Sequence, residues 1–324
     1  MGQADEQRNP TREGVVAAAR KLAAFLPPTP LIPFAIDGQQ VWAKAECLQP
    51  VGAFKIRGAW HRLSDMSDAE RACGVVAVSS GNHAQGVAWA AQRLGMVAAI
   101  VMPEDAPRIK LDRTRELGAE VITYDRMREN REAIGRALAE ERGATLVHAF
   151  ADPWVIEGQG SSGIELTEQL TAQTGDGPTR ILAPCGGGGL TAGLALACPE
   201  AEIVPVEPEG WDDVCRSIEA GTIQPVGEAP PPTACDALQT LATNPLNFAV
   251  LKARCPYGLR VSAAEVRTAQ RFAFSRLRLV LEPGGAVALA AALAGKAPLD
   301  GRTVIMLSGG NVDPRQFAQV IWQA

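Results

Sequence analysis

Short apolar runs and stretches of helical periodicity alternate along most of this 324-residue chain. The apolar runs are bounded by Gly, Ser or Pro, which is typical of strands buried on both faces of a parallel sheet. The predicted strands span residues 40–45, 74–78, 97–102, 120–123, 145–148, 180–183, 203–207 and 303–307. The predicted helices span residues 13–26, 84–94, 107–117, 128–142, 161–173, 263–276 and 283–293. This alternation with short links predicts an α/β protein with doubly wound, parallel, twisted sheets flanked by helices.

The strongest local signal is a run of four glycines between a predicted strand and a predicted helix, in the segment CGGGGLTAG at 185–193. Backbone without Cβ atoms can approach an anion closely, and a helix N-terminus adds N–H donors, so the segment predicts a phosphate cradle. It also fits the pattern G-x-G-x-x-A, and Glu207 stands about where the ribose-binding acid of a dinucleotide enzyme would lie. An NAD-dependent dehydrogenase that uses the Gly186–Gly189 loop therefore stays open, as do glycines that serve only a tight turn.

A lysine follows another strand break. Pro50 and Gly52 end the strand at 40–45, and Lys55 then falls near the start of a predicted helix that continues to Leu63. Apolar neighbours and helix N-terminal dipoles both disfavour a charged amine. Lys55 is therefore a candidate neutral nucleophile that can form an imine with a carbonyl cofactor. A surface lysine at a helix start is the alternative.

Two further polar loops follow predicted strands, SSGNH at 79–83 and SGGN at 308–311. Ligands collect at the carboxyl ends of parallel strands, so both loops are candidate binding segments, and the first can hold a carboxylate. Capping of the next helix is the alternative for the first loop. His83 can serve there as a base or as a hydrogen-bonding residue of the loop.

Three acidic residues, Glu207, Asp212 and Asp213, cluster after one predicted strand. Oxygen ligands at this spacing suit Mg²⁺ or Ca²⁺. N-capping of the next helix by Asp212 or Asp213 explains the same residues, and both interpretations stay open.

The composition is that of an ordinary globular protein, with 47% hydrophobic and 21% charged residues. A net charge of −5 gives no support for nucleic-acid binding. Seven cysteines without a C-x-x-C pair indicate reduced thiols in a cytoplasmic protein. The polar segment 1–14 is not a signal peptide, and no apolar run is long enough to span a membrane.

Four motifs occur in a fixed order: LQPVGAFKIRGA at 48–59, SSGNHAQG at 79–86, CGGGGL at 185–190 and LSGGN at 307–311. Together they resemble the serine/threonine dehydratases and serine racemases, which are pyridoxal-phosphate enzymes of the tryptophan-synthase-β fold type, fold type II. The resemblance implies a large cofactor-binding domain formed by residues 1–70 and 149–324, and a small inserted domain at 71–148. It also implies a homodimer and a small amino-acid substrate.

The resemblance implies roles for the motif residues around pyridoxal 5′-phosphate. Lys55 would form the imine with the cofactor and later remove the substrate Cα proton. Ser80 would be the acid/base on the opposite face of the cofactor ring. Asn82 would hydrogen-bond the phenolic oxygen, and Ser308 would face the pyridine nitrogen. The implied cofactor-binding residues are Phe54, Lys55, Asn82, Gly186, Gly187, Gly188, Gly189, Leu190 and Ser308.

The resemblance also implies a substrate site and a site for Mg²⁺ or another divalent cation. The implied substrate-binding residues, of which the first four grip the carboxylate, are Ser80, Gly81, Asn82, His83, Phe150 and Asp236. The implied cation ligands are Glu207, the carbonyl of Trp211, and Asp213.

Some positions depart from the family pattern. Ala53 replaces the usual serine or threonine, Ala237 replaces the usual glycine, and Phe150 stands where serine racemases tend to have asparagine. We therefore expect a dehydratase that converts a 3-hydroxy amino acid of the L-threonine/L-serine type to a 2-oxo acid and ammonia. The alternatives are an amino-acid racemase, a threo-3-hydroxyaspartate dehydratase, and a non-enzymatic amino-acid sensor on a decayed scaffold.

Overall fold

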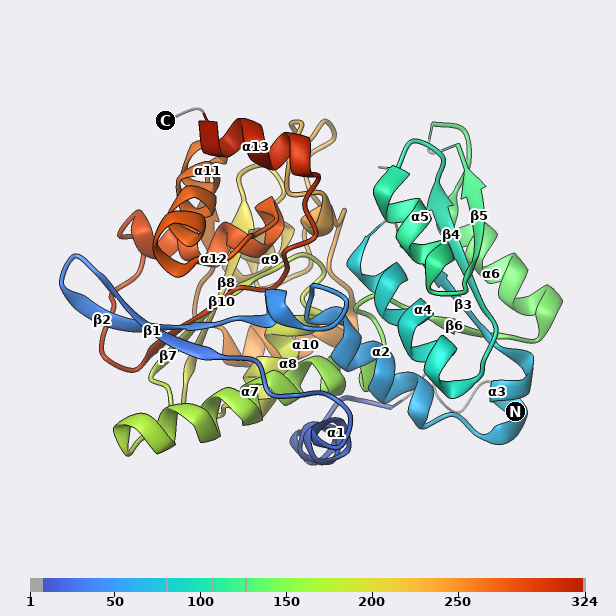
Figure 1. Ribbon diagram of the computed structural model, residues 1–324, viewed down its shortest axis with the longest axis horizontal. Helices are drawn as coiled ribbons and strands as arrows, with labels where there is room; N and C mark the ends of the chain where they lie inside the picture. The colour runs from blue at the N-terminus through green and yellow to red at the C-terminus, as the bar shows by residue number, and fades with distance from the viewer. Residues whose placement is uncertain (1–7, 80, 107, 126, 323–324) are drawn as a thin grey trace.

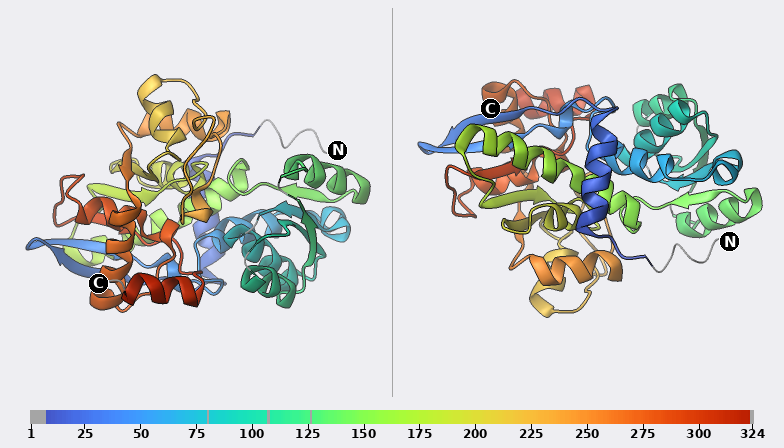
Figure 2. Two further views of the ribbon diagram at one scale, coloured as in Figure 1. Left: turned by 90° about the horizontal axis from the view of Figure 1, so that it is seen from above. Right: turned by 90° about the horizontal axis from the view of Figure 1, so that it is seen from below.

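Two sheets lie side by side, each flanked by helices, in the computed structural model, which describes residues 8–322 except 80, 107 and 126 (Figures 1 and 2). The larger sheet has the order β1 (Leu31–Ile36), β2 (Gln39–Lys44), β10 (Thr303–Met306), β7 (Arg180–Pro184), β8 (Glu202–Pro208) and β9 (Leu259–Val261). The smaller sheet has the order β5 (Glu120–Tyr124), β4 (Ala98–Pro103), β3 (Val75–Val78) and β6 (Thr145–Val147).

The helices cover both sheets. Those in the first half of the chain are α1 (Arg12–Ala23), α2 (Lys55–Ser64), α3 (Asp68–Cys73), α4 (Asn82–Leu94), α5 (Arg108–Glu116), α6 (Arg131–Arg142) and α7 (Pro153–Thr174). The later ones are α8 (Gly189–Ala197), α9 (Asp213–Ala220), α10 (Pro245–Arg254), α11 (Ala263–Phe272), α12 (Pro283–Leu293) and α13 (Pro314–Trp322). Short helical turns are η2 (Glu46–Leu48), η3 (Asp236–Leu238) and η4 (Ala273–Leu277).

The strand pairs are parallel with one exception, which confirms the predicted fold class. The exception is β1, which pairs with β2 in antiparallel orientation at the edge of the larger sheet. Asp37 and Gly38 connect the two strands, and both have positive φ, at 49° and 82°. Such a two-residue turn matches the twist of a hairpin, so β1 needs no crossover helix.

Three helices meet through glycines near the middle of the molecule. A Cβ on Gly158 of α7 would lie 2.6 Å from the Cα of Gly58 in α2. A Cβ on Gly193 of α8 would lie 2.4 Å from the carbonyl oxygen of Ile156 in α7. Because these side-chain positions are empty, the backbones of α2 and α8 both approach α7 closely. This packing places Lys55 and Gly189, the first residues of α2 and α8, in one region.

The same glycines explain one difference from the prediction. The sequence predicts a helix over 161–173, whereas α7 begins at Pro153, with Asp152 as its N-cap. Gly158 and Gly160 suggest a loop when propensity alone is considered. In the folded chain the buried contacts of α7 with α2 and α8 outweigh that cost.

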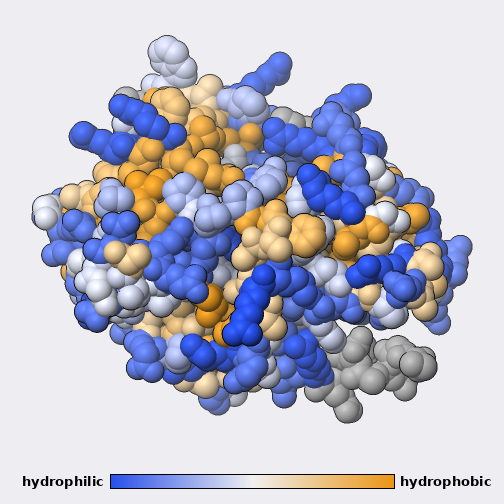
Figure 3. Space-filling model, turned by 60° about the horizontal axis from the view of Figure 1, so that its bottom comes forward, coloured by the Kyte–Doolittle hydropathy of each residue, from blue (hydrophilic) through white to orange (hydrophobic). Residues whose placement is uncertain are grey.

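The surface of the face shown in Figure 3 is mixed, with hydrophobic patches between hydrophilic residues. Large hydrophobic side chains that are exposed include Phe274 and Trp322, the latter 86% accessible. None of the helices in the described part of the chain combines the length and apolar character needed to cross a membrane.

Candidate active site

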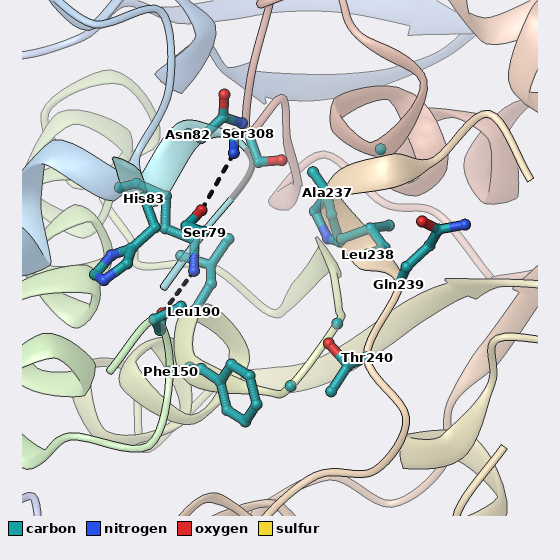
Figure 4. Close-up of a pocket in the computed structure, with 18 of the residues that line it drawn as sticks. Ser79, Asn82, His83, Phe150, Leu190, Ala237, Leu238, Gln239, Thr240 and Ser308 are labelled. Carbon is teal, nitrogen blue, oxygen red and sulfur yellow. Dashed lines mark hydrogen bonds between the residues drawn. The ribbon is translucent and has the colours of Figure 1, made fainter. Parts of the chain in front are cut away.

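A pocket collects the loops that follow strands of both sheets (Figure 4). Its lining includes most of the residues that the sequence singles out, namely Phe54, Lys55, Gly81, Asn82, His83, Phe150, Gly186, Gly187, Gly188, Gly189, Leu190, Asp236 and Ser308. Ser80 lies outside the described residues. The three expected cation ligands do not line this pocket. The chain therefore brings together segments that are separated by more than 200 residues of sequence.

Lys55 begins α2 and points its amine into the pocket. Its Nζ donates a hydrogen bond of 2.7 Å to the carbonyl oxygen of Ala149, and it lies 5.1 Å from the ring centroid of Phe54. In the described part of the chain no carboxylate forms an ion pair with this amine. Burial without a counter-charge lowers the pKa of Lys55 to about 8. A substantial fraction of the amine is therefore neutral near physiological pH.

The four glycines connect β7 to α8 and form one wall of the pocket. A Cβ on Gly187 would lie 2.4 Å from the Phe150 ring, and one on Gly189 would lie 3.1 Å from the Cα of Phe150. The first backbone N–H groups of a helix have no intrahelical acceptor, so the start of α8 presents free donors. This is an anion cradle that would be closed by any side chain larger than hydrogen.

Asn82, the first residue of α4, lies at the centre of a buried polar chain. Its Nδ2 donates to Oε1 of Glu282 at 2.5 Å, and its Oδ1 accepts from Nδ2 of Asn311 at 2.9 Å. Burial raises the pKa of Glu282 to about 7. The second carboxyl oxygen of Glu282 is buried without a hydrogen-bond partner among the described residues. Glu282 can therefore hold or release a proton at the edge of the pocket.

His83 is held in a fixed orientation by its Nε2, which lies 3.0 Å from the carbonyl oxygen of Val147. A carbonyl only accepts, so this nitrogen carries the proton. Burial, followed by the nearby Lys55 charge, lowers the pKa of His83 to about 3. The ring stays neutral at working pH, which favours the hydrogen-bonding role over that of a base.

Ser308 follows β10 and is 4% exposed beside Asn82 (Figure 4). The carbonyl oxygen of Ser308 accepts a hydrogen bond of 3.1 Å from the backbone N–H of Phe54. Gly309 and Ala53 form an isolated antiparallel bridge. The loop after β10 is thereby tied to the residues directly before Lys55.

Phe150, labelled in Figure 4, and Asp236 also line the pocket. The Phe150 ring packs edge-on against His148, with centroids 4.6 Å apart. Asp236 forms an ion pair with Lys110 of α5, so it links the segment 236–240 to the smaller sheet's helices. Arg131, the first residue of α6, also lines the pocket.

Comparison with known proteins agrees with this geometry. The family model described as "Pyridoxal-phosphate dependent enzyme" matches residues 23–309. The chain belongs to this family. It is 42% identical over 317 residues to the L-threo-3-hydroxyaspartate ammonia-lyase of a Pseudomonas species, covering 95% of this chain and 97% of that protein. It is 36% identical to the serine racemase of Schizosaccharomyces pombe, covering 97% and 98% of the two chains.

The solved structures agree as well. The threonine deaminase of T.th. superimposes with a TM-score of 0.86 at 44% identity, covering 94% of this chain and 99% of that one. These findings confirm the resemblance to the pyridoxal-phosphate dehydratases and racemases, and they confirm fold type II.

The residues present fit the cofactor that defines the pyridoxal-phosphate dependent family. The anion cradle at 186–189 suits a phosphate, and Lys55 supplies a partly neutral amine in the same pocket. The two features come from different parts of the chain and meet only in the folded protein.

The expected cation ligands form a separate group behind β8. Both carboxyl oxygens of Glu207 accept backbone hydrogen bonds, from Val214 at 3.2 Å and from Cys215 at 2.7 Å. Burial, followed by the neighbouring Asp213, raises the pKa of Glu207, and burial raises the pKa of Asp213 to about 7. Trp211 donates its indole N–H to the carbonyl of Pro231 at 2.8 Å. The described residues contain no group of three or more His, Cys, Asp or Glu that could hold a metal ion.

Sequence reasoning missed three charged residues at the site of this pyridoxal-phosphate enzyme: Glu282 and Arg131, which line the pocket, and Lys110, which pairs with the pocket residue Asp236. Glu282 directly precedes Pro283, and an acid before a proline-initiated helix reads as an ordinary cap. Arg131 and Lys110 lie on helices rich in other charges, so the sequence contains no signal that separates them. Only the folded structure places Glu282 and Arg131 at the pocket and Lys110 against Asp236.

Proposed function

We propose that this protein is a pyridoxal-phosphate dependent ammonia-lyase that eliminates water from a 3-hydroxy amino acid and releases a 2-oxo acid and ammonia. The observation that carries the proposal is the Lys55 amine, which is buried without a counter-charge where the four motif loops meet. The relatives named as ammonia-lyases and threonine deaminase support the same reaction class.

In this proposal the backbone N–H groups of Gly186–Gly189 and Leu190 would hold the cofactor phosphate. Phe54 and Asn82 would contact the cofactor ring, and the neutral hydroxyl of Ser308 would face its pyridine nitrogen. When bound, pyridoxal phosphate supplies an electron sink for the bonds at the substrate Cα. The remaining tasks belong to the side chains of this chain.

Lys55 is the attachment point of the cofactor and the base that accepts the Cα proton. The lowered pKa of about 8 supports this role, because a protonated amine cannot accept a proton. Gly81, Asn82 and His83 hold the substrate carboxylate through N–H donors, with Ser80 as a further contact. For His83 this donor is the backbone N–H, because the neutral ring gives its single N–H to the Val147 carbonyl.

We further propose that the preferred substrate is a 3-hydroxy amino acid with a second carboxylate, of the 3-hydroxyaspartate type. Arg131 supports this, because its guanidinium group is the cation in the pocket lining that can bind a carboxylate through two hydrogen bonds. Its Nε lies 3.4 Å from a carboxyl oxygen of Glu132, and both side chains are exposed, by 48% and 40%, so this pair leaves the guanidinium group accessible. Two relatives, from Pseudomonas and Saccharomyces cerevisiae, are named L-threo-3-hydroxyaspartate ammonia-lyases.

The test is 2-oxo acid release from L-threo-3-hydroxyaspartate, L-threonine and L-serine, with the wild type and Arg131→Ala. We expect kcat/KM for the dicarboxylic substrate to fall about a hundredfold, since a charge-assisted pair is lost. The values for L-threonine and L-serine should change little. Arg128→Ala is the matched control, because Arg128 is 85% exposed on the same segment. An equal fall for all three substrates would contradict the role of Arg131, whereas no product from any substrate would contradict the lyase.

Amino-acid racemisation is the alternative activity, because relatives of 36% and 35% identity are named serine racemases. Ser80→Ala should then abolish racemisation and largely spare elimination from the L-isomer. Phe150 against the glycine loop favours elimination over racemisation. Family membership favours a pyridoxal-phosphate site over the nicotinamide site that the glycine pattern also allowed.

We propose a divalent-cation site at Glu207, Asp213 and the Trp211 carbonyl. Support comes from Asp213, whose carboxyl oxygens are both buried without a hydrogen-bond partner among the described residues. Added Mg²⁺ should raise the melting temperature of the wild type and leave Asp213→Asn unchanged. A shift of equal size in both proteins would contradict this site.

Three further proposals concern organisation. We propose domains at 1–70 with 149–324 and at 71–148, consistent with the strands of the smaller sheet falling between Val75 and Val147. A homodimer is supported by α13, which buries none of its residues within the described chain. Light scattering on the purified protein tests the dimer.

A cytoplasmic location is supported by the cysteines, which are free.

A further inference from the structure

The carbonyl group of Gly187 points away from the pocket, toward the start of α10. Nδ2 of Asn247 donates to this oxygen at 2.5 Å, and Oγ1 of Thr243 donates to it at 3.1 Å. Asn247 is fully buried and Thr243 is 5% exposed. Two buried side-chain donors thus converge on one backbone oxygen of the glycine loop.

This arrangement determines where the next amide points. In a trans peptide the C=O and the following N–H point in opposite directions, and the described chain has no cis peptide bonds. The N–H of Gly188 therefore points away from Asn247 and Thr243. A Cβ on Gly188 would lie 2.7 Å from Leu251 behind the loop, whereas one on Gly187 would meet Phe150 on the pocket side. The loop lies between these two layers, and the Gly188 amide faces the pocket.

The peptide group between Gly187 and Gly188 has little intrinsic preference for turning its N–H or its C=O toward the pocket. Glycine populates both signs of φ, and Gly188 has a φ of +89°. Rotation of this peptide would turn the carbonyl oxygen, which carries partial negative charge, toward the pocket. A bound phosphate would then face an acceptor in place of a donor. Something outside the loop must hold the peptide in the donor orientation.

We infer that Asn247 and Thr243 are positioning residues for the cofactor phosphate. They hold the Gly187 carbonyl from behind and so keep the Gly188 N–H turned toward the phosphate. The inference rests on the proposed cofactor site in the glycine loop. Neither residue belongs to one of the four motifs, and neither lines the pocket.

The test separates the phosphate from the rest of the cofactor. Pyridoxine 5′-phosphate and pyridoxine lack the aldehyde, so neither can attach to Lys55, and they differ only in the phosphate. Both are titrated calorimetrically into the full-length protein freed of cofactor. We expect Asn247→Ala to weaken binding of pyridoxine 5′-phosphate about tenfold and to leave pyridoxine within about twofold. Thr243→Val should weaken the phosphate compound about threefold, and Thr243→Ser should restore it.

Asn244→Ala is the matched control. The Asn244 side chain caps α10 by accepting the N–H of Asn247 at 3.0 Å, and among the described residues it forms no hydrogen bond with the glycine loop. Phosphate-specific weakening in Asn247→Ala and not in Asn244→Ala supports the inference. Equal weakening in both variants, equal weakening of both compounds, or wild-type affinity in Asn247→Ala would overturn it. A wild type that binds the two compounds equally would overturn the phosphate site itself, and this inference with it.

Discussion

Lys44 ends β2 and Lys55 begins α2, 11 positions later in the sequence, and the two lysines have opposite electrostatic surroundings. Lys44 is fully buried, yet it forms an ion pair with Glu165 and donates to the Thr29 carbonyl at 2.8 Å. Among the described residues, Lys55 has the carbonyl of Ala149 as its only hydrogen-bond partner and no carboxylate beside it. Burial lowers the pKa of both amines, but Glu46 and Glu165 oppose the effect at Lys44.

The difference extends to the neighbours of each lysine. Arg57, two residues after Lys55, donates to both carboxyl oxygens of Glu46 at 2.7 Å and to Glu165 at 2.9 Å. With Lys44, these residues form a buried network in which each charge meets an opposite charge. Arg57 anchors the first turn of α2 to this network. Lys55, the first residue of α2, is left without a counter-charge. Paired charges therefore provide structure, whereas the unpaired amine is free for chemistry.

Replacing each lysine in turn tests most directly whether the two lysines have different roles, and it has the largest expected effect. Lys55→Ala should lower turnover at least about a thousandfold, because both the attachment point and the base are lost. It should also abolish the visible absorbance of the bound cofactor. Lys44→Met should keep that absorbance and lower only stability. Normal turnover in Lys55→Ala, or loss of the absorbance in Lys44→Met, would reverse the assignment of the two lysines.

A second prediction concerns the network. Arg57→Met should lower the free energy of unfolding by about 3–5 kcal/mol, because the buried Glu46 carboxylate loses its partner. Urea unfolding measures the change. Arg142→Ala is the control, since the Arg142–Glu120 pair is exposed and should contribute less than about 1 kcal/mol. Equal losses in the two variants would show that burial adds nothing to the Arg57 network.

The smallest expected effect concerns Glu282, whose pKa of about 7 is raised by burial. Because the pKa of Glu282 is higher in the folded protein than in the unfolded chain, its protonated form favours the folded state. This contribution is fully present below the pKa of the unfolded chain and is lost as the pH rises through the folded pKa of about 7. Between pH 5.5 and 8.5, the cofactor-free wild type should lose about 2 kcal/mol that Glu282→Gln does not lose. Urea unfolding of both proteins at the two pH values gives this difference. Parallel pH profiles would show that Glu282 is already ionised in the folded protein.

Much of the fold was predictable, because strands and helices bounded by glycine depend on local pattern. The helices α3, α9, α10 and α13 and the short strand β9 were not predicted, since none of them has a long apolar run. The start of α7 was missed because Gly158 and Gly160 look like helix breakers, although they are contact points for α2 and α8. The sequence alone does not distinguish a glycine that allows close helix packing from a glycine that allows a turn.

The sequence by itself determined the alternation of strands and helices, the four motif loops and the family. Those features are local, and each depends on a few neighbouring residues. Only the tertiary structure decided which charges meet. Glu282 reaches Asn82 across 200 positions, and Asn247 reaches Gly187 across 60. It also decided that Lys44 is paired and Lys55 is not, because a pKa depends on burial and on charges brought close by folding.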